Sequence, residues 1–187
     1  MSVIINSISV LNDSVVEPIS LTDAKSWMRI TYNEDDSLIN DLISSSRRHI
    51  EMLTGCSFVN KVIRTNLSLN GYQPNVWMVD LPYSPLGCVD EVKLKTGINM
   101  YDILVKDDDY EVIGGKLWLY IMGNYSIKYQ CGYSSAPDDI KSDILTLVAW
   151  SYENRGKKFQ GDAKAGALKE YPNWDGLNYH QYKKVVI

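Results

Sequence analysis

A change of hydrophobic period within one stretch decides the fold class. Residues 36–69 read DSLINDLISSSRRHIEMLTGCSFVNKVIRTNLSL. Apolar residues first recur at helical spacing, at Leu38, Ile39, Leu42, Ile43, Ile50 and Leu53. Gly55 then suits a left-handed cap. After it, Ile63, Leu67 and Leu69 alternate with polar residues, as in a half-buried strand. The stretch predicts a helix over about 35–54 followed by a strand, and hence an α+β chain.

Two further helices flank this stretch. Ser20 followed by Asp23 resembles a capping box ahead of an apolar repeat, which predicts a first helix over about 20–29. At residues 136–139, APDD, proline fits the first helical position and the acidic residues favour the positive end of the helix dipole. We expect a third helix there, over about 137–155 and closed by Gly156. The predicted helical core therefore contains about three helices.

Strand patterns fill the region between the second and third helices, from about 58 to 133. The expected strands are 63–69, 76–81, 89–94, 109–113, 117–121 and 125–130. Gly114-Gly115 and Gly123-Asn124 suit two-residue hairpin turns. The pattern predicts an antiparallel sheet, connected as a meander, and leaves residues 98–108 without a firm expectation.

The last part of the chain has no sustained period. Residues 156–187 are rich in Gly, Lys, Tyr and Trp, and we interpret them as an irregular C-terminal arm. Since no repeat or long linker divides the rest, residues 1–155 are expected to form one domain. This makes a single domain with a peripheral arm the expected organisation.

Composition argues against several classes of protein. The chain has 187 residues, a formal net charge of -4 and scattered Lys and Arg, which disfavours direct nucleic-acid binding. Residues 1–11 lack the basic start and long apolar run of a signal peptide, and no run reaches the ~20 apolar residues that span a bilayer. Three widely spaced cysteines form no C-x-x-C pair, which favours a reducing compartment. We expect a protein made in a cytoplasm, without membrane attachment.

The residues that could carry chemistry have simpler explanations. His49 falls at the edge of an apolar helical stripe, where a boundary histidine is the better interpretation than a catalytic base, and His180 has no acid spaced for metal binding. Residues 107–109, DDD, lack the glycine and distal glutamate of a calcium loop. Gly114-Gly115 precedes no helix that could bind phosphate. We expect no catalytic residue, metal or cofactor.

The order and spacing of several motifs resemble the phage head-tail connector (adaptor) family. They lie over roughly residues 20–155 and comprise Leu21-Thr22-Asp23-Ala24-Lys25, Met28-Arg29-Ile30, Thr54-Gly55, Leu81-Pro82, Gly132-Tyr133, Trp150 and Tyr152-Glu153-Asn154-Arg155. The resemblance implies a structural virion protein that joins the portal to the neck or tail. A ring of about a dozen copies would form by a heterologous contact that closes, which needs two different faces on each subunit.

The same resemblance implies the partners. They are further copies of the chain, the portal protein, and neck or tail-completion proteins. DNA would pass through the lumen without specific binding, and the protein would reside in the virion after assembly in the cytoplasm of the bacterial host. The alternatives are a neck stopper or tail-completion protein, favoured by a sheet-dominated fold with a long loop, and a non-viral interaction module or an enzyme.

Eight residues are candidates for these contacts: Arg47, Arg48, Glu153, Arg155, Tyr171, Trp174, Tyr179 and Tyr182. Arg47 and Arg48 otherwise belong to the solvated face of the second helix, where exposed ion pairs add little stability. Glu153 and Arg155 lie on the third helix or at its end. The four aromatic residues of the arm suggest anchors for a neighbour, with folding back on the parent sheet as the alternative.

Overall fold

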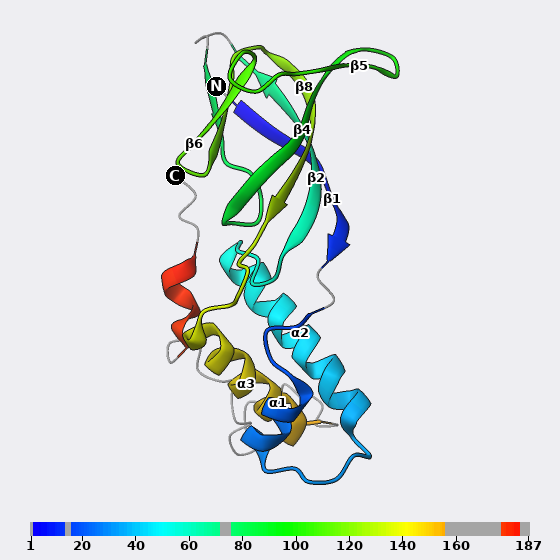
Figure 1. Cartoon of the computed structure of the whole chain (residues 1–187), viewed down its shortest axis with the longest axis vertical. Coiled ribbons are helices and arrows are strands. Elements are labelled where there is room, and N and C mark those ends of the chain that lie inside the picture. The colour runs from blue at the N-terminus through cyan, green and yellow to red at the C-terminus, as the bar shows by residue number, and fades with distance from the viewer. Residues whose placement is uncertain (1, 14–15, 72–75, 156–176, 184–187) are drawn as a thin grey trace, which may run out of the picture. The chain divides into compact units, whose positions relative to one another are not determined.

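The computed structural model describes residues 2–13, 16–71, 76–155 and 177–183, and separates into two compact units. The β unit comprises residues up to Val15 together with Gly55–Ser134. The helical unit comprises Val16–Thr54 and the residues from Ser135 onward. The chain therefore passes from the β unit into the helices, back to the β unit, and into the helices again (Figure 1).

The helices form where the hydrophobic period predicted them. They are α1 (Leu21–Met28), α2 (Asp36–Thr54) and α3 (Asp138–Glu153), followed by the short 3-10 helix η2 (Asn178–Tyr182). The Ser20 hydroxyl accepts a hydrogen bond from the Asp23 amide at 3.1 Å, as a capping residue does. Gly55 has φ of 70°, the left-handed conformation expected after α2. Three predicted helices are confirmed.

One apolar core holds the helices together. It is drawn from α1, α2, α3 and the segments beside them, and includes Ile19, Ala24, Ile39, Ile43, Ile50, Ile140, Ile144, Leu147 and Val148. Each of these side chains is at most a few per cent exposed. Burying an aliphatic side chain of this size contributes roughly 1.5–3 kcal/mol, so these buried residues stabilise the packing of the helices on one another.

The β unit contains two antiparallel sheets. The five-stranded sheet has the order β1-β2-β8-β4-β5 and the three-stranded sheet the order β3-β7-β6. The strands are β1 (Ser2–Asp13), β2 (Lys61–Asn70), β3 (Trp77–Val79), β4 (Leu86–Gly97), β5 (Met100–Ile103), β6 (Tyr110–Ile113), β7 (Lys116–Leu119) and β8 (Gly123–Cys131). A sheet between the second and third helices is confirmed, as is the α+β class.

Both sheets contribute to one buried core. Ile63 and Leu67 of β2 and Ile127 of β8 are fully buried together with Leu117 and Leu119 of β7. Alternate residues of β2 and β8 are buried, which is the pattern of strands with one face on a core. We call this side of the five-stranded sheet its inner face, and the opposite side its outer face.

The connectivity differs from the expected meander. β2 pairs with β8, although the sequence between them contains five strands, and β3 lies in the other sheet. Gly114-Gly115 does form a hairpin, with φ of 61° and 73° between Ile113 and Lys116. Gly123-Asn124 does not: both residues lie in β8 and face β2. A turn dipeptide identifies where a chain can reverse, but pairing is set by which apolar faces meet.

The sequence interpretation missed β1 and β5. No strand was predicted in residues 1–11, although Ile and Val alternate there with polar residues. In the structure β1 pairs antiparallel with β2 over its whole length, with register shifts after Ile5 and after Val10. β5 lies in the region for which no structure was predicted. These two missed strands form the two edges of the five-stranded sheet.

Candidate interaction surfaces

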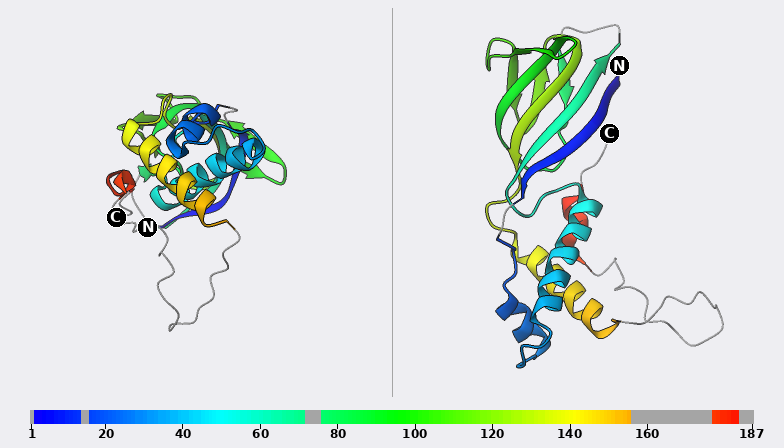
Figure 2. Two further views of the ribbon diagram at one scale, coloured as in Figure 1. Left: turned by 90° about the horizontal axis from the view of Figure 1, so that it is seen from below. Right: turned by 90° about the vertical axis from the view of Figure 1, so that its right-hand side faces the viewer.

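The first candidate surface is the edge strand β1, which is exposed throughout residues 2–12 (Figure 2, right). Val3, Ile5, Ile8 and Val10 stand opposite Leu69, Leu67, Thr65 and Ile63 of β2, respectively. Directly opposed residues of an antiparallel pair point to the same face, so these four side chains lie on the inner face. They are 38–49% exposed, whereas their four β2 partners are at most 2% exposed. We call these four residues the β1 strip.

The β1 strip is thus an extension of the core face that nothing in the described chain covers. Residues 2–12 contain no charged residue and no proline. Natural edge strands are usually protected by charges, proline, bulges or short length. β1 has two register shifts, but it is twelve residues long and otherwise unprotected. An edge of this kind is typical of a surface that another chain covers.

The second candidate surface is the hairpin formed by β4 and β5, which projects beyond the rest of the β unit (Figure 1). Its apolar side chains are strongly exposed: Ile98 by 91%, Met100 by 64%, Tyr101 by 47%, Ile103 by 67% and Val105 by 56%. We call these five residues the β5 patch. Tyr101 and Ile103 stand opposite Lys95 and Lys93 of β4, so the exposed apolar side chains have charged neighbours. Strongly exposed apolar side chains of this kind suit an interaction surface.

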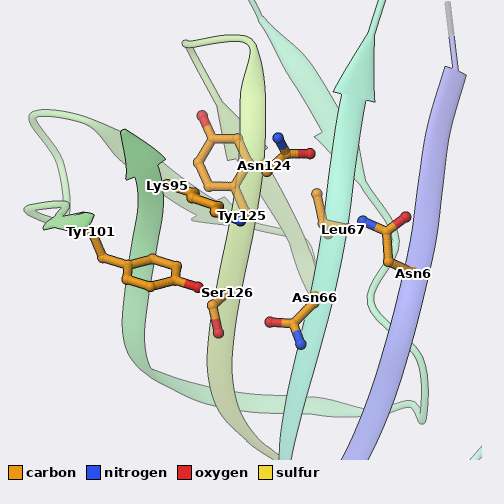
Figure 3. A pocket seen from close by; sticks show the side chains of 8 residues that line it. All are labelled: Asn6, Asn66, Leu67, Lys95, Tyr101, Asn124, Tyr125 and Ser126. Carbon is orange, nitrogen blue, oxygen red and sulfur yellow. The ribbon is translucent and has the colours of Figure 1, made fainter. Parts of the chain in front are cut away.

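An open depression of about 310 Å³ lies on the outer face, between the two edges (Figure 3). Neutral polar side chains from β1, β2 and β8 line much of it, with Lys95 and Tyr101 on the side of β4 and β5. Several of these polar groups bond to neighbouring strands: the Asn6 amide donates to Ser68 at 2.7 Å, and the Asn66 amide donates to Ser7 at 2.9 Å. The lining contains no carboxylate, histidine or cysteine, so it offers no acid-base pair.

Arg47 lies inside the helical unit and not on its surface. Its side chain is 2% exposed and donates two hydrogen bonds to Glu17, at 2.7 and 3.1 Å, and one to Glu51 at 2.8 Å. Burial alone would raise the pKa of Glu17, but the hydrogen bonds from Arg47 and Ser44 outweigh it, and the pKa is lowered. The expectation that Arg47 belongs to a solvated face is wrong, because the segment preceding α1 covers this part of α2.

Arg48, the next residue, is exposed, as that interpretation expected. Its charge contributes to the lowered pKa of Glu17, but only as the smallest cause. The two neighbouring arginines therefore have different surroundings: Arg47 is buried and paired with Glu51, whereas Arg48 is exposed.

Part of the C-terminal arm packs on α3. The Tyr179 amide donates to Asp143 at 2.9 Å and the Asn178 side chain to the same carboxylate at 3.1 Å. One turn earlier on α3, Asp139 accepts hydrogen bonds from Gln181 and from the Tyr182 hydroxyl. Asp143 and Tyr179 are each 2% exposed. We call Asp139 and Asp143 the α3 clasp, since each carboxylate satisfies donors of η2.

The α3 clasp corrects one part of the aromatic interpretation. Tyr179 was a candidate anchor for a neighbour, but it is buried against its own chain, and Tyr182 is half-buried beside it. The alternative of folding back on the parent sheet is also not what the structure shows, because η2 packs on helices. Tyr171 and Trp174 lie outside the described residues.

The end of α3 is joined to the turn before α2. The Tyr152 hydroxyl donates to Asp35, and Arg155 donates to the same carboxylate oxygen at 2.8 Å. The hydroxyls of Tyr32 and Tyr152 are hydrogen-bonded at 2.7 Å. The hydrogen bond to Asp35 raises the pKa of Tyr152 to about 12, and the pKa of Asp35 is lowered by the same contact and by Arg155. Arg155 is thus half exposed but already paired within the chain, while Glu153 is exposed.

The described residues give little support for a catalytic or metal site. Within ranges 2–13, 16–71, 76–155 and 177–183, no three His, Cys, Asp or Glu side chains gather closely enough to hold a metal ion. Partial burial lowers the pKa of His49, which fits the boundary histidine predicted from its spacing. His180 stacks on Tyr179, with ring centroids 4.3 Å apart. No helix in the described part of the chain has the length and hydropathy needed to span a membrane.

Comparison with known proteins points to one class. Residues 18–78 match the family model described as phage gp6-like head-tail connector protein, which confirms the resemblance predicted from the sequence. The matched segment includes α1, α2 and β2. No curated protein sequence shows a significant match to the chain.

Three solved chains share the fold over nearly their whole length. One belongs to the virion of a native gene transfer agent (GTA) particle, with 16% identity, a TM-score of 0.70 and 96% coverage of each chain. A chain of the neck of the empty GTA particle, computed with C6 symmetry, has 13% identity, a TM-score of 0.68 and 97% coverage of each chain. A chain of the native neck, computed with C12 symmetry, has 16% identity, a TM-score of 0.60 and coverages of 96% and 97%. In fold, this chain is similar to those neck and virion chains.

Proposed function

We propose that the chain is a structural virion protein, a head-tail connector subunit that forms a ring in the neck of a tailed particle. The observation that carries the proposal is the agreement of two comparisons. The connector family match covers residues 18–78, and the GTA chains share the fold over 96–97% of this chain. Its mechanism is mechanical: each subunit binds neighbouring copies laterally and presents its remaining surfaces to the portal and to neck or tail components.

A structural role also agrees with where the chain places its polar groups. The helical unit uses Arg47, Asp139, Asp143 and Asp35 for internal contacts, and many of the exposed apolar side chains lie on the edges of the five-stranded sheet. Binding surfaces of protein assemblies have apolar centres depleted in charge, as the β1 strip has. We therefore propose a role without catalysis and without a cofactor.

Loss of the chain from the particle provides the direct test. Particles produced in a host that lacks a functional copy of the gene should accumulate as DNA-filled heads separate from tails, and the wild-type gene supplied in trans should restore tailed particles. Imaging of the restored neck should locate the fold as a ring next to the portal. Normal tailed particles without the chain would contradict the proposal.

A neck stopper or tail-completion role is the second candidate. The projecting β4–β5 hairpin and the large share of β structure favour it. The connector role is preferred because residues 18–78 match that family. The position in the neck separates them: a connector ring contacts the portal directly, whereas a stopper ring lies beyond the connector, on the tail side.

A further inference from the structure

We propose that copies of this chain bind one another through the two opposite edges of the five-stranded sheet, with the β5 patch of one copy docked on the β1 strip of the next. The inference rests on the proposed function, because it assigns the lateral contact of the same ring. The proposal places the ring contact in the β unit. Candidate contact residues were instead predicted from the sequence in the C-terminal arm and in the third helix.

The two surfaces differ in shape and agree in chemistry. The β1 strip is a row of aliphatic side chains along an edge strand, and the β5 patch runs from the turn of a projecting hairpin along β5 to Val105. Neither surface is covered by another described part of the chain. Both consist mainly of Val, Ile and Met side chains, which gain free energy by leaving water together.

A second copy is the occupant that covers both surfaces at once. β1 and β5 lie at opposite ends of one sheet, so a neighbour on either side meets a different edge. A heterologous contact that closes into a ring uses two different faces on every subunit and leaves none exposed. Closure also removes the exposed sheet edges that would otherwise promote aggregation. A single foreign partner bound at one edge would leave the other edge open.

The exposed apolar side chains can supply part of a stable contact. Side chains of this size expose roughly 60–120 Å² each when free, so the four of the β1 strip, at 38–49% exposure, present on the order of 100–200 Å², and the five of the β5 patch present on the order of 200–400 Å². A standard interface buries about 800 Å² per partner, of which a little over half is apolar. The two patches thus form the centre of such an interface, with polar neighbours as its rim.

Charge substitutions at each edge test the proposal in the full-length chain. Ile5→Lys with Ile8→Lys alters the β1 strip, and Ile98→Lys with Ile103→Lys alters the β5 patch. Because all four side chains are exposed, each variant should keep the wild-type circular dichroism and melting temperature. Sedimentation and native mass measurements should show subunit affinity reduced by roughly 100-fold in both variants.

The matched control is Met78→Lys with Ile113→Lys. These residues are 45% and 54% exposed and belong to β3 and β6 of the other sheet. The control should associate like wild type. If it loses assembly as completely as the edge variants, or if either edge variant assembles normally, the proposed contact is wrong.

Mixing the two edge variants gives a sharper result. Each variant retains one intact surface, so an equimolar mixture should form a dimer of one copy of each and stop there. Growth of the mixture into rings would overturn the pairing of these two surfaces, as would its failure to dimerise. This outcome also excludes misfolding, since only folded chains can complement each other.

The result is distinguishable from failure of the proposed function. A wild-type chain that stays monomeric at its highest soluble concentration overturns the self-docking inference. The neck role would then still be decided by the tailless phenotype. Conversely, normal tailed particles without the chain overturn the neck role, even if the purified chain forms rings.

Discussion

The helical unit and the β unit differ in how charged and apolar side chains are used. In the helical unit, buried or half-buried charges join segments that are distant in sequence: Arg47 holds the segment before α1, and Asp143 holds η2. In the β unit, the core between the sheets is closed, but the apolar face continues onto β1, which no other described part of the chain covers. The internal contacts of Arg47 and Asp143 stabilise the subunit, whereas the β1 strip is the surface that we propose for assembly.

The largest effect is expected at Arg47. Arg47→Met would remove the Arg47 guanidinium from the buried Glu51 carboxylate, which is 2% exposed. Removing one partner of a buried pair costs about 3–5 kcal/mol of unfolding free energy. Urea denaturation followed by helical circular dichroism measures the loss. The control Arg48→Met alters an exposed neighbour and should change stability by less than about 0.5 kcal/mol. If Arg47→Met and Arg48→Met lower the unfolding free energy equally, the contacts of Arg47 do not contribute the expected stability.

A nearly comparable effect is expected in the β unit at Gly132. Its φ is 104°, and a Cβ atom there would lie 2.1 Å from the Val59 carbonyl oxygen. Gly132→Ala should therefore destabilise the chain by about 3 kcal/mol or more. Gly114 also has positive φ, but a Cβ would meet nothing within 4 Å, so Gly114→Ala should cost only about 1–2 kcal/mol. Thermal unfolding measures both variants, and Gly132→Ala should have the lower melting temperature. A lower melting temperature for Gly114→Ala would contradict the predicted clash at Gly132.

A smaller, local effect is expected at the α3 clasp. Asp143→Ala leaves the Tyr179 amide and the Asn178 side chain without their acceptor, which costs about 1–3 kcal/mol when the donors stay buried. Hydrogen exchange at the Tyr179 amide should accelerate accordingly. Asp138→Ala, on the same helix but with a 98% exposed side chain, should leave that amide protected. Unchanged exchange in Asp143→Ala would contradict the docking of η2.

The smallest effect is a pH dependence of the helical unit. The pKa of Glu17 is lowered from 4.5 in the folded chain, so its contribution is fully present above pH 4.5 and is lost as the pH falls through the folded pKa. Stability should decline as the pH falls below about 4.5, and the decline should be small because this group is partly exposed. Denaturation of wild type and Glu17→Gln between pH 3 and 7 tests it. Glu17→Gln should lose less stability than wild type as the pH falls. An identical loss in both proteins would exclude Glu17 as the cause.

Local patterns were sufficient for the helices and for most strands. Caps at Ser20 and Gly55 and the change of period after α2 act within a few residues, so they can be recognised without tertiary information. Strand pairing cannot be recognised from local patterns. β2 pairs with β8 because their apolar faces share one core, and the paired residues are more than fifty positions apart. For the same reason the dipeptide Gly123-Asn124 predicts a turn where the structure has a strand. The alternation of Ile and Val in β1 is a local strand signal, but its pairing with β2 is not local.

The candidate site residues also depend on contacts that only the tertiary fold creates. Arg47 and Tyr179 were expected at contacts with other chains, but both are buried within their own chain. Their partners Glu17 and Asp143 lie on other elements, and only the fold brings them together. The i,i+4 spacing of Arg47 and Glu51 and of Asp139 and Asp143 was the one available signal. The interface roles of Arg48, Glu153 and Arg155 remain predictions. The β1 strip could have been found by asking which apolar strand lacks a cover.

Hydrogen exchange of the free and self-assembled full-length chain tests the difference between the two units most directly. Assembly should slow exchange in β1 and in the β4–β5 hairpin, while α2, α3 and the Tyr179 amide keep the protection they have in the free chain. Slower exchange confined to the helices, with β1 and the hairpin unchanged, would contradict the assignment of the assembly surface to the edges of the five-stranded sheet.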